Sequence, residues 1–391
     1  MRAPSSGHLT TRAGRGGRLT VVLGLVTCLL GLVACSSGSG STSADSSATG
    51  SQGTQNCVEA AKAAVAKGMA PISPQYPSPI NVTLNRGKTI WYVSFDQEVQ
   101  VLDSISQGFV AAAEASGLKV HIFDGAGNAA TQAAGVNQAV SSGADAILLQ
   151  GIDPSLVSTA LAKAKAAGIP VIDSFNGNYN APLPTGIVGH VSLYYPYEGS
   201  LMVDYALANS NCEAHILELT SSLSTGLAAK SVAMGTELNR LCPKTCSLDI
   251  QQVNFTTITT QVPQLVTTNL ERDPAINWIM PTADAIAVYA VPTVDSSRSK
   301  ARVISTDGQT QDLGWVRGGQ AQVADISYPP LQYIGWYQVD DLQRALLHAK
   351  LASGLIPVQL FDHATLAADA SAMFPKFAGF EASYERLWGL K

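Results

Sequence analysis

The sequence predicts an α/β fold made of two Rossmann-like lobes, each built on a parallel sheet. Short apolar runs typical of buried strands alternate with helical runs, and the strand-like runs recur about every 25 to 30 residues. The alternation stops once, near residues 166–178, and then restarts, which gives two sets of βαβ units. A length of 391 residues with 46% hydrophobic and 14% charged side chains is enough for two cores.

Residues 1–34 have the features of a signal peptide. Four arginines precede the apolar run Leu19–Ala34, which ends in the order Leu, Val, Ala, Cys at Cys35. This ending resembles the signal of bacterial lipoproteins, in which the cysteine becomes the lipidated first residue. The alternative is a single membrane-spanning helix, but the run is short for a hydrocarbon core about 30 Å thick.

The segment after Cys35 is expected to have little regular structure. Residues 35–55 are almost entirely Ser, Gly, Thr, Ala and Gln, so they have almost nothing to bury and predict a flexible tether. Residues 56–86 begin with a helical run at Val58–Lys67 and continue through four closely spaced prolines that break regular structure. We expect these residues to form a strap ahead of the first lobe.

The first set of βαβ units begins at Thr89. Its expected strands are Thr89–Ser94, Lys119–Phe123, Ala144–Gln150 and Pro170–Ser174, and its expected helices are Leu102–Ser116, Ala130–Ser141 and Pro154–Ala167. At the end of this set the last helix stops at Gly168, Pro170 opens the fourth strand, and the polar residues after Ser174 cannot continue it. We interpret this point as the boundary between the lobes.

The second set follows the same rhythm. Its expected helices are Glu198–Ala208, Ala228–Leu241, Thr259–Glu271 and Asp284–Val291, and its expected strands are His215–Leu219, Ser247–Asn254, Trp278–Met280 and Arg302–Ser305. Beyond these we expect helices at Gln311–Arg317, Gln332–His348 and Tyr384–Gly389 and strands at Ala321–Ser327 and Pro357–Phe361.

The charge balance excludes a non-specific nucleic-acid binder. Removal of residues 1–34 takes four of the 24 basic residues and none of the 29 acidic ones, which leaves a formal charge of -9. A chain that neutralises phosphates should instead be basic.

Four cysteines after Cys35 favour disulfide bonds, because their number is even and the chain is expected outside the cytoplasm. They are Cys57, Cys212, Cys242 and Cys246, and three pairings are possible. Cys212 and Cys246 each stand just before a predicted strand and can meet across a sheet edge, while Cys242 with Cys246 is the alternative pair.

The sequence shows no catalytic or cofactor-binding constellation. Phosphate-binding, serine-nucleophile and zinc-protease motifs are absent, and none of the six histidines has metal-ligand spacing from another. Gly125–Ala130 fits the dinucleotide pattern G-x-G-x-x-A, but the strand that follows does not end in an acidic residue. We therefore expect a tight turn there, no metal, no cofactor and no enzyme.

Ligands of open α/β sheets bind outside the carboxyl ends of the strands. Gln97 and Asn176 are polar residues at such ends, after the first and fourth strands. Phe95, Phe175 and Tyr328 also follow predicted strands, where an aromatic ring can cover the apolar face of a sugar.

Several of these segments resemble one known family. They are Gln107–Phe109, Gly143–Leu149, Ile152–Pro154, Ala166–Ile172 and Val303–Gly308. With the lipoprotein signal, they make the chain similar to the solute-binding lipoproteins of bacterial ABC importers, of the ribose type, also called type I periplasmic binding proteins. The resemblance covers about residues 87–350.

The resemblance implies a hinge of three segments, near residues 174–177, 306–308 and 328–330. The N-terminal lobe would then comprise residues 87–175 and 308–327, and the C-terminal lobe residues 178–306 and 330–391.

The resemblance also implies binding roles for Asp307, Asp284 and Lys230. The family's Asp-Arg pair at the first crossing is replaced by Phe175-Asn176, and the glutamine of the third crossing is Tyr328. The Asn-Pro-Phe-Phe run after the first strand is Val99–Leu102 in this chain.

Together these observations predict a monomeric, extracytoplasmic receptor that is anchored to the membrane by lipid. It would capture a small polar solute, sugar or sugar-like, between closing lobes and deliver it to an ABC permease. The alternatives are a sensor that presents its closed form to a membrane receptor, and a binder of a non-sugar small molecule.

Overall fold

The computed structural model describes residues 45–222, 224–366 and 373–391. The predicted signal peptide and Cys35 lie outside these residues. The predicted tether is wrong over its last part, because residues 45–55 belong to helix α1 (Asp45–Gly68). After α1, residues 71–81 carry no helix or strand, and a 3-10 turn, η1 (Val82–Asn85), leads into the first strand.

The first lobe contains a five-stranded parallel sheet in the order β2-β1-β3-β4-β5. Its strands are β1 (Thr89–Ser94), β2 (Lys119–Asp124), β3 (Ala146–Gln150), β4 (Val171–Ser174) and β5 (Gly189–Val191). The helices between them are α2 (Gln100–Ser116), α3 (Ala129–Ser141) and α4 (Ser158–Ala166). Asn128 caps α3 by accepting from the backbone N–H groups of Ala130 and Thr131, at 2.9 and 3.1 Å. The glycine-rich run before α3 is thus a turn into a capped helix.

The second lobe repeats this strand order and adds one antiparallel strand, giving the order β11-β10-β9-β8-β6-β7. Its strands are β6 (His215–Thr220), β7 (Ser247–Gln252), β8 (Trp278–Pro281), β9 (Arg302–Asp307), β10 (Gln322–Ser327) and β11 (Gln359–Asp362). Its helices are α5 (Tyr195–Asn209), α6 (Thr225–Leu241), α7 (Ile258–Arg272), α8 (Asp284–Ser296) and α9 (Thr310–Gly318). The predicted fold class, two lobes with mostly parallel sheets, is confirmed.

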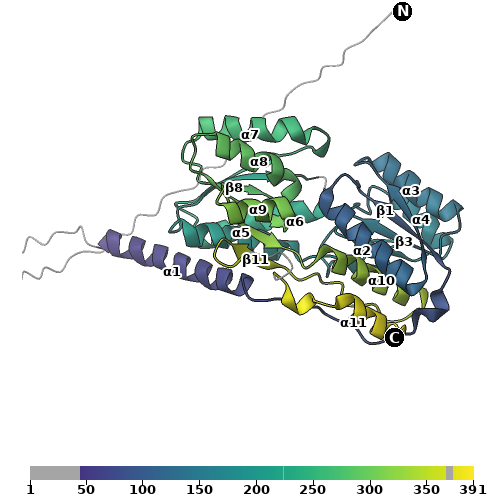
Figure 1. Cartoon of the computed structure of the whole chain (residues 1–391). Coiled ribbons are helices and arrows are strands. Elements are labelled where there is room, and N and C mark those ends of the chain that lie inside the picture. Colours follow the sequence, from purple (N-terminus) through teal and green to yellow (C-terminus); the bar gives the residue numbers. More distant parts are fainter. Residues whose placement is uncertain (1–44, 223, 367–372) are drawn as a thin grey trace, which may run out of the picture. The chain divides into compact units, whose positions relative to one another are not determined.

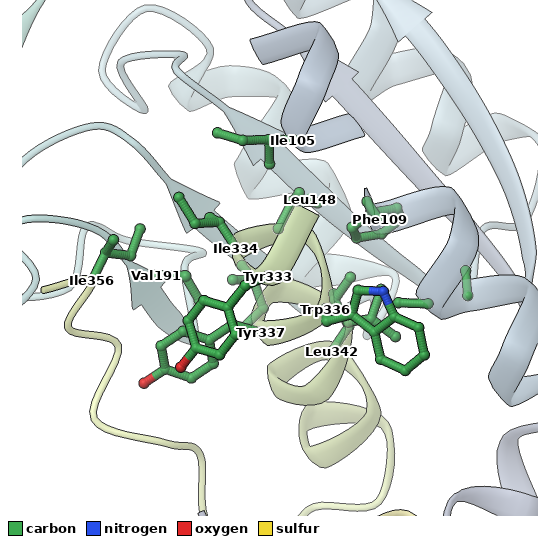
Figure 2. Packing of buried hydrophobic residues seen from close by; sticks show 14 of the residues in the cluster. Ile105, Phe109, Leu148, Val191, Tyr333, Ile334, Trp336, Tyr337, Leu342 and Ile356 are labelled. Carbon is green, nitrogen blue, oxygen red and sulfur yellow. The ribbon is translucent and has the colours of Figure 1, made fainter. Parts of the chain in front are cut away.

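Helix α10 (Leu331–Leu346) belongs to the first lobe. It lies beside α2 (Figure 1), and the two share one apolar core with strands of the first sheet (Figure 2). On α10, the Gln338 amide donates to Gln150 on β3 and to Ser174 on β4, both at 2.7 Å. The final helix α11 (Phe380–Leu387) packs on α10, and Trp336 stacks on the Trp388 ring 5.3 Å away.

The predicted assignment of segments to lobes is therefore wrong at several places. Residues 308–327 lie in the second lobe, because β10 pairs with β9, whereas β5, α10 and α11 lie in the first. Residues 192–194, 328–330 and 347–358 are segments that cross between the lobes, and the first and third of these meet at a bridge between Ser192 and Leu355. The chain also crosses from α1 to β1 and from β11 to α11. Periodicity identifies a strand from its own residues, but the sheet that it joins depends on contacts distant in sequence.

All four cysteines predicted in disulfides are paired, but the pairing Cys212–Cys246 is wrong. The bonds are Cys57–Cys212 and Cys242–Cys246. Cys57 lies on α1, which packs on the apolar core of the second lobe, so that α1 brings it to Cys212 in the loop between α5 and β6. The position of α1 could not be read from the spacing of the cysteines.

Candidate functional site

The candidate site is a cavity where the carboxyl ends of the two sheets face each other. Its walls come from residues after β1, β3 and β4 in the first lobe and after β6, β7, β8 and β9 in the second, and its volume is about 110 Å³. That volume is several times what a single water needs. The lining residues are Phe95, Val99, Val101, Leu102, Gly151, Phe175, Tyr195, Ser224, Leu227, Phe255, Ala283, Ala285, Asp307 and Tyr328.

Aromatic rings from both lobes form much of this wall. Phe95 and Phe255 meet edge to face across the lobes with ring centroids 6.1 Å apart, and Phe175 meets Tyr328 in the same manner at 5.5 Å. Such rings offer flat apolar surfaces, which pack well against the face of a small ring. Burial of a polar group against them without a hydrogen-bond partner is unfavourable.

Asp307 at the end of β9 is the one charged side chain that lines this cavity among the described residues. Its carboxylate accepts from the Asp284 backbone N–H and the Thr306 hydroxyl, both at 3.2 Å. Burial raises the pKa of Asp307, and the positive charge of Lys230 opposes that rise.

Two lining residues have backbone conformations that cost energy. The φ angles of Phe175 and Asp307 are +57° and +126°, in the region that side-chain-bearing residues rarely adopt. Gly308 after Asp307 also has a positive φ, +80°, and a Cβ there would lie 2.6 Å from the Cβ of Ser327. Strained backbone of this kind tends to occur at ligand sites.

Lys230 on α6 does not line the cavity and is fully buried. Its Nζ lies 2.8 Å from Glu198 Oε2 and donates to the Thr306 hydroxyl at 2.6 Å and the Thr282 carbonyl at 3.1 Å. An ammonium has three N–H groups, so these partners occupy its donors. Burial raises the pKa of Glu198 to about 6, and Lys230 limits that rise.

Three other predicted site residues also lie outside the cavity lining. Asp284, buried in the first turn of α8, accepts from the backbone N–H of Gln309 at 2.8 Å, and burial with nearby carboxylates raises its pKa well above the ordinary value. Gln97 accepts from Ser106, and Asn176 is buried after β4.

The structure thus brings Phe95, Phe175, Asp307 and Tyr328 around one cavity. It places Gln97, Asn176, Lys230 and Asp284 behind or beside that cavity.

The sequence analysis missed Phe255, the second ring of the interlobe pair. Phe255 directly follows the predicted strand Ser247–Asn254, as Phe95 directly follows the predicted strand Thr89–Ser94, so the rule that selected Phe95 also selects Phe255. No sequence pattern predicts Ala283 and Ala285 as lining residues, because their small side chains contribute only by leaving room for the cavity.

One hydrogen bond joins the lobes near the cavity. The Thr225 hydroxyl at the start of α6 donates to Asp153 Oδ2 at 2.8 Å, and Asp153 lies in the segment between β3 and α4. This contact and the Phe95–Phe255 pair are two of the interactions between the lobes that opening of the cleft would break.

The described part of the chain contains no helix long and apolar enough to cross a bilayer. Within the same residues, no three His, Cys, Asp or Glu side chains are arranged so that they could hold a metal ion.

A family model described as periplasmic binding protein domain matches residues 90–350 of the chain. Among curated proteins, the ribose import binding protein RbsB of Bacillus subtilis (strain 168) is 30% identical over 99 residues. That match covers 25% of this chain and 32% of the relative, so the chain aligns with about a third of the relative's length.

Solved structures share the fold at low sequence identity. An ABC sugar transporter subunit from Rhodobacter sphaeroides 2.4.1 is 17% identical with a TM-score of 0.64, over 71% of this chain and 99% of that one. A carbohydrate transporter from Acidothermus cellulolyticus 11B, in complex with myo-inositol, is 20% identical with a TM-score of 0.61, over 74% and 99%.

Proposed function

The chain belongs to the periplasmic binding protein family, and on that premise we propose that it is the extracytoplasmic solute-binding component of an ABC importer. Its ligand is a small sugar or sugar-like solute held in the interlobe cavity. The observation that carries the proposal is the cavity itself, with aromatic rings from both lobes and one carboxylate at the carboxyl ends of two parallel sheets.

The proposed mechanism is closure of the lobes around the solute. A ring that lies against both Phe95 and Phe255 touches both lobes at once, so the solute binds the closed form more tightly than the open form and shifts the equilibrium toward it. The segments that cross between the lobes would bend in this motion while α2 and α10 stay packed in the first lobe. The closed form is the one that a permease would recognise.

We also propose that residues 1–34 are removed as a signal peptide and that lipid on Cys35 anchors the chain to the membrane. Support comes from the order Leu, Val, Ala, Cys after the apolar run. Cys35→Ala should move the protein from the membrane fraction to the soluble fraction. Retention of the variant in the membrane fraction would contradict the anchor.

A thermal-shift screen of the full chain tests the binding function. The panel contains sugars, polyols, amino acids and nucleosides, and a solute at about 100 times its Kd should stabilise the protein by about 2.7 kcal/mol. The proposal predicts a shift of a few degrees with a sugar or sugar-like compound. A shift confined to amino acids or nucleosides would contradict the sugar class.

A further inference from the structure

The cavity offers few polar partners for a ligand. Four lining side chains carry polar atoms, and all four have partners in the protein. The Tyr328 hydroxyl donates to Glu198, the Tyr195 hydroxyl bonds to Ser192, and the Ser224 hydroxyl accepts from the backbone at the start of α6. The fourth side chain is Asp307.

A fully hydroxylated sugar fits such a wall poorly. Each hydroxyl group buried without a partner costs about 1–3 kcal/mol, and a hexose brings five. Val99, Leu102 and Phe255 instead present apolar surface. The lining therefore favours a ring with few hydroxyl groups.

The charge of the lining favours a cationic ligand. No Lys, Arg or His is among the residues that line the cavity, and the nearest cation, Lys230, is occupied by Glu198. Asp307 accepts from the Asp284 N–H and the Thr306 hydroxyl and also bonds to the Tyr328 hydroxyl, and a carboxylate has about four acceptor sites, so one site remains for a further N–H group. An anionic ligand would meet this carboxylate with no compensating cation.

The aromatic rings point to the same class of ligand. A cation near the face of a phenylalanine or tyrosine ring is attracted by the ring's quadrupole, more strongly when water is excluded. Five rings line this cavity, from Phe95, Phe175, Tyr195, Phe255 and Tyr328. A protonated amine beside Asp307 would gain both the charged hydrogen bond and the contact with the rings.

We propose that the solute captured in the cleft is a sugar-like ring that has few hydroxyl groups and one protonated amine, such as an amine-bearing deoxy sugar. This inference rests on the proposed function and specifies its ligand. The ammonium binds the Asp307 carboxylate, and the ring lies against Phe95 and Phe255.

The test compares three ligands that share one ring, with the full chain in calorimetry and thermal shift. They are trans-4-aminocyclohexanol, trans-1,4-cyclohexanediol and trans-4-hydroxycyclohexanecarboxylate. The amine should bind about tenfold more tightly than the diol, since a charged hydrogen bond contributes about 1.5–3 kcal/mol and 1.4 kcal/mol is a factor of ten. The carboxylate should not bind.

Two variants locate the effect. Asp307→Asn keeps the shape of the side chain and should abolish the preference for the amine over the diol. Phe255→Leu keeps an apolar side chain at a half-exposed position but removes the aromatic ring, so it should weaken binding of the amine more than binding of the diol. Glu98→Gln is the control, because Glu98 is exposed after the same strand as Phe95 and does not line the cavity. Its amine affinity should equal that of the unchanged protein.

The outcomes separate this inference from the function on which it rests. Binding of D-glucose or myo-inositol as tight as that of the amine overturns the inference and leaves a sugar receptor. Absence of amine binding also overturns it. If the sugar panel is negative as well, the proposed function fails with it. An amine preference that survives in both Asp307→Asn and Phe255→Leu would place the ligand outside this cavity.

Discussion

Replacing Lys230 by methionine tests whether this residue holds the second lobe together or binds the ligand. Lys230 and Glu198 are both fully buried and 2.8 Å apart. Removal of one partner from a buried ion pair leaves an uncompensated charge and costs about 3–5 kcal/mol. We expect a loss of this size in the free energy of unfolding at pH 7, measured by urea titration.

The size of this loss should depend on pH. In the unchanged protein the pKa of Glu198 is raised to about 6, above its value in the unfolded chain. The free energy of unfolding therefore falls as the pH rises from about 4.5 to 6, and the Glu198 carboxyl causes no further change above pH 6. Without Lys230 the folded pKa rises further, and the loss continues above pH 6. Because one pKa unit corresponds to 1.36 kcal/mol, the penalty of Lys230→Met should grow by about 1.4 kcal/mol between pH 6 and 7.

The double variant Lys230→Met/Glu198→Gln supplies the control. It removes the Glu198 carboxyl, so the penalty should grow less above pH 6 than in the single variant, and the remaining growth belongs to Asp307, whose raised pKa Lys230 also opposes. The double variant should be more stable than the single variant at pH 8. Lys62→Met, which replaces an exposed lysine on α1, should change little. A single-variant penalty below about 1 kcal/mol, or one that does not change with pH, would refute the structural role of Lys230.

Two further predictions concern the lobes. Loss of the bond Cys57–Cys212, which closes a loop of 155 residues, should lower the free energy of unfolding in urea by up to about 5 kcal/mol. Loss of Cys242–Cys246, which closes a loop of four residues, should lower it by about 2 kcal/mol. Equal losses would contradict the loop-closure account. Thr225→Val removes the hydrogen bond between Thr225 and Asp153, so the ligand-free variant should have a larger radius of gyration in X-ray scattering. The control Thr260→Val on α7 should leave the radius unchanged. An unchanged radius in Thr225→Val would mean that this bond does not hold the cleft closed.

Local patterns predicted the strands well and their sheets poorly. β1 was predicted with its observed bounds because its apolar residues are buried wherever the strand lies. β5 was missed, because three residues that include His190 do not form a periodic pattern. The lobe that holds α10 depends on bonds such as that from Gln338 to Gln150, 188 residues apart in sequence, and no local pattern contains them.

The candidate site shows the same limit. The rule that ligands lie at strand ends selected Phe95, Phe175 and Tyr328, because each directly follows a strand, and all three line the cavity. Asp307 was selected through the family resemblance. Lys230 was expected to reach a ligand, but its charge is taken by Glu198 on another helix. A lysine's own sequence neighbourhood does not reveal its ion-pair partner.

A crystal structure of the full chain with the solute that gives the largest thermal shift tests the central claim most directly. The account predicts that the solute lies in the cavity against Phe95 and Phe255, with one nitrogen or oxygen about 3 Å from the Asp307 carboxylate. A solute bound elsewhere on the chain while this cavity stays empty would contradict it.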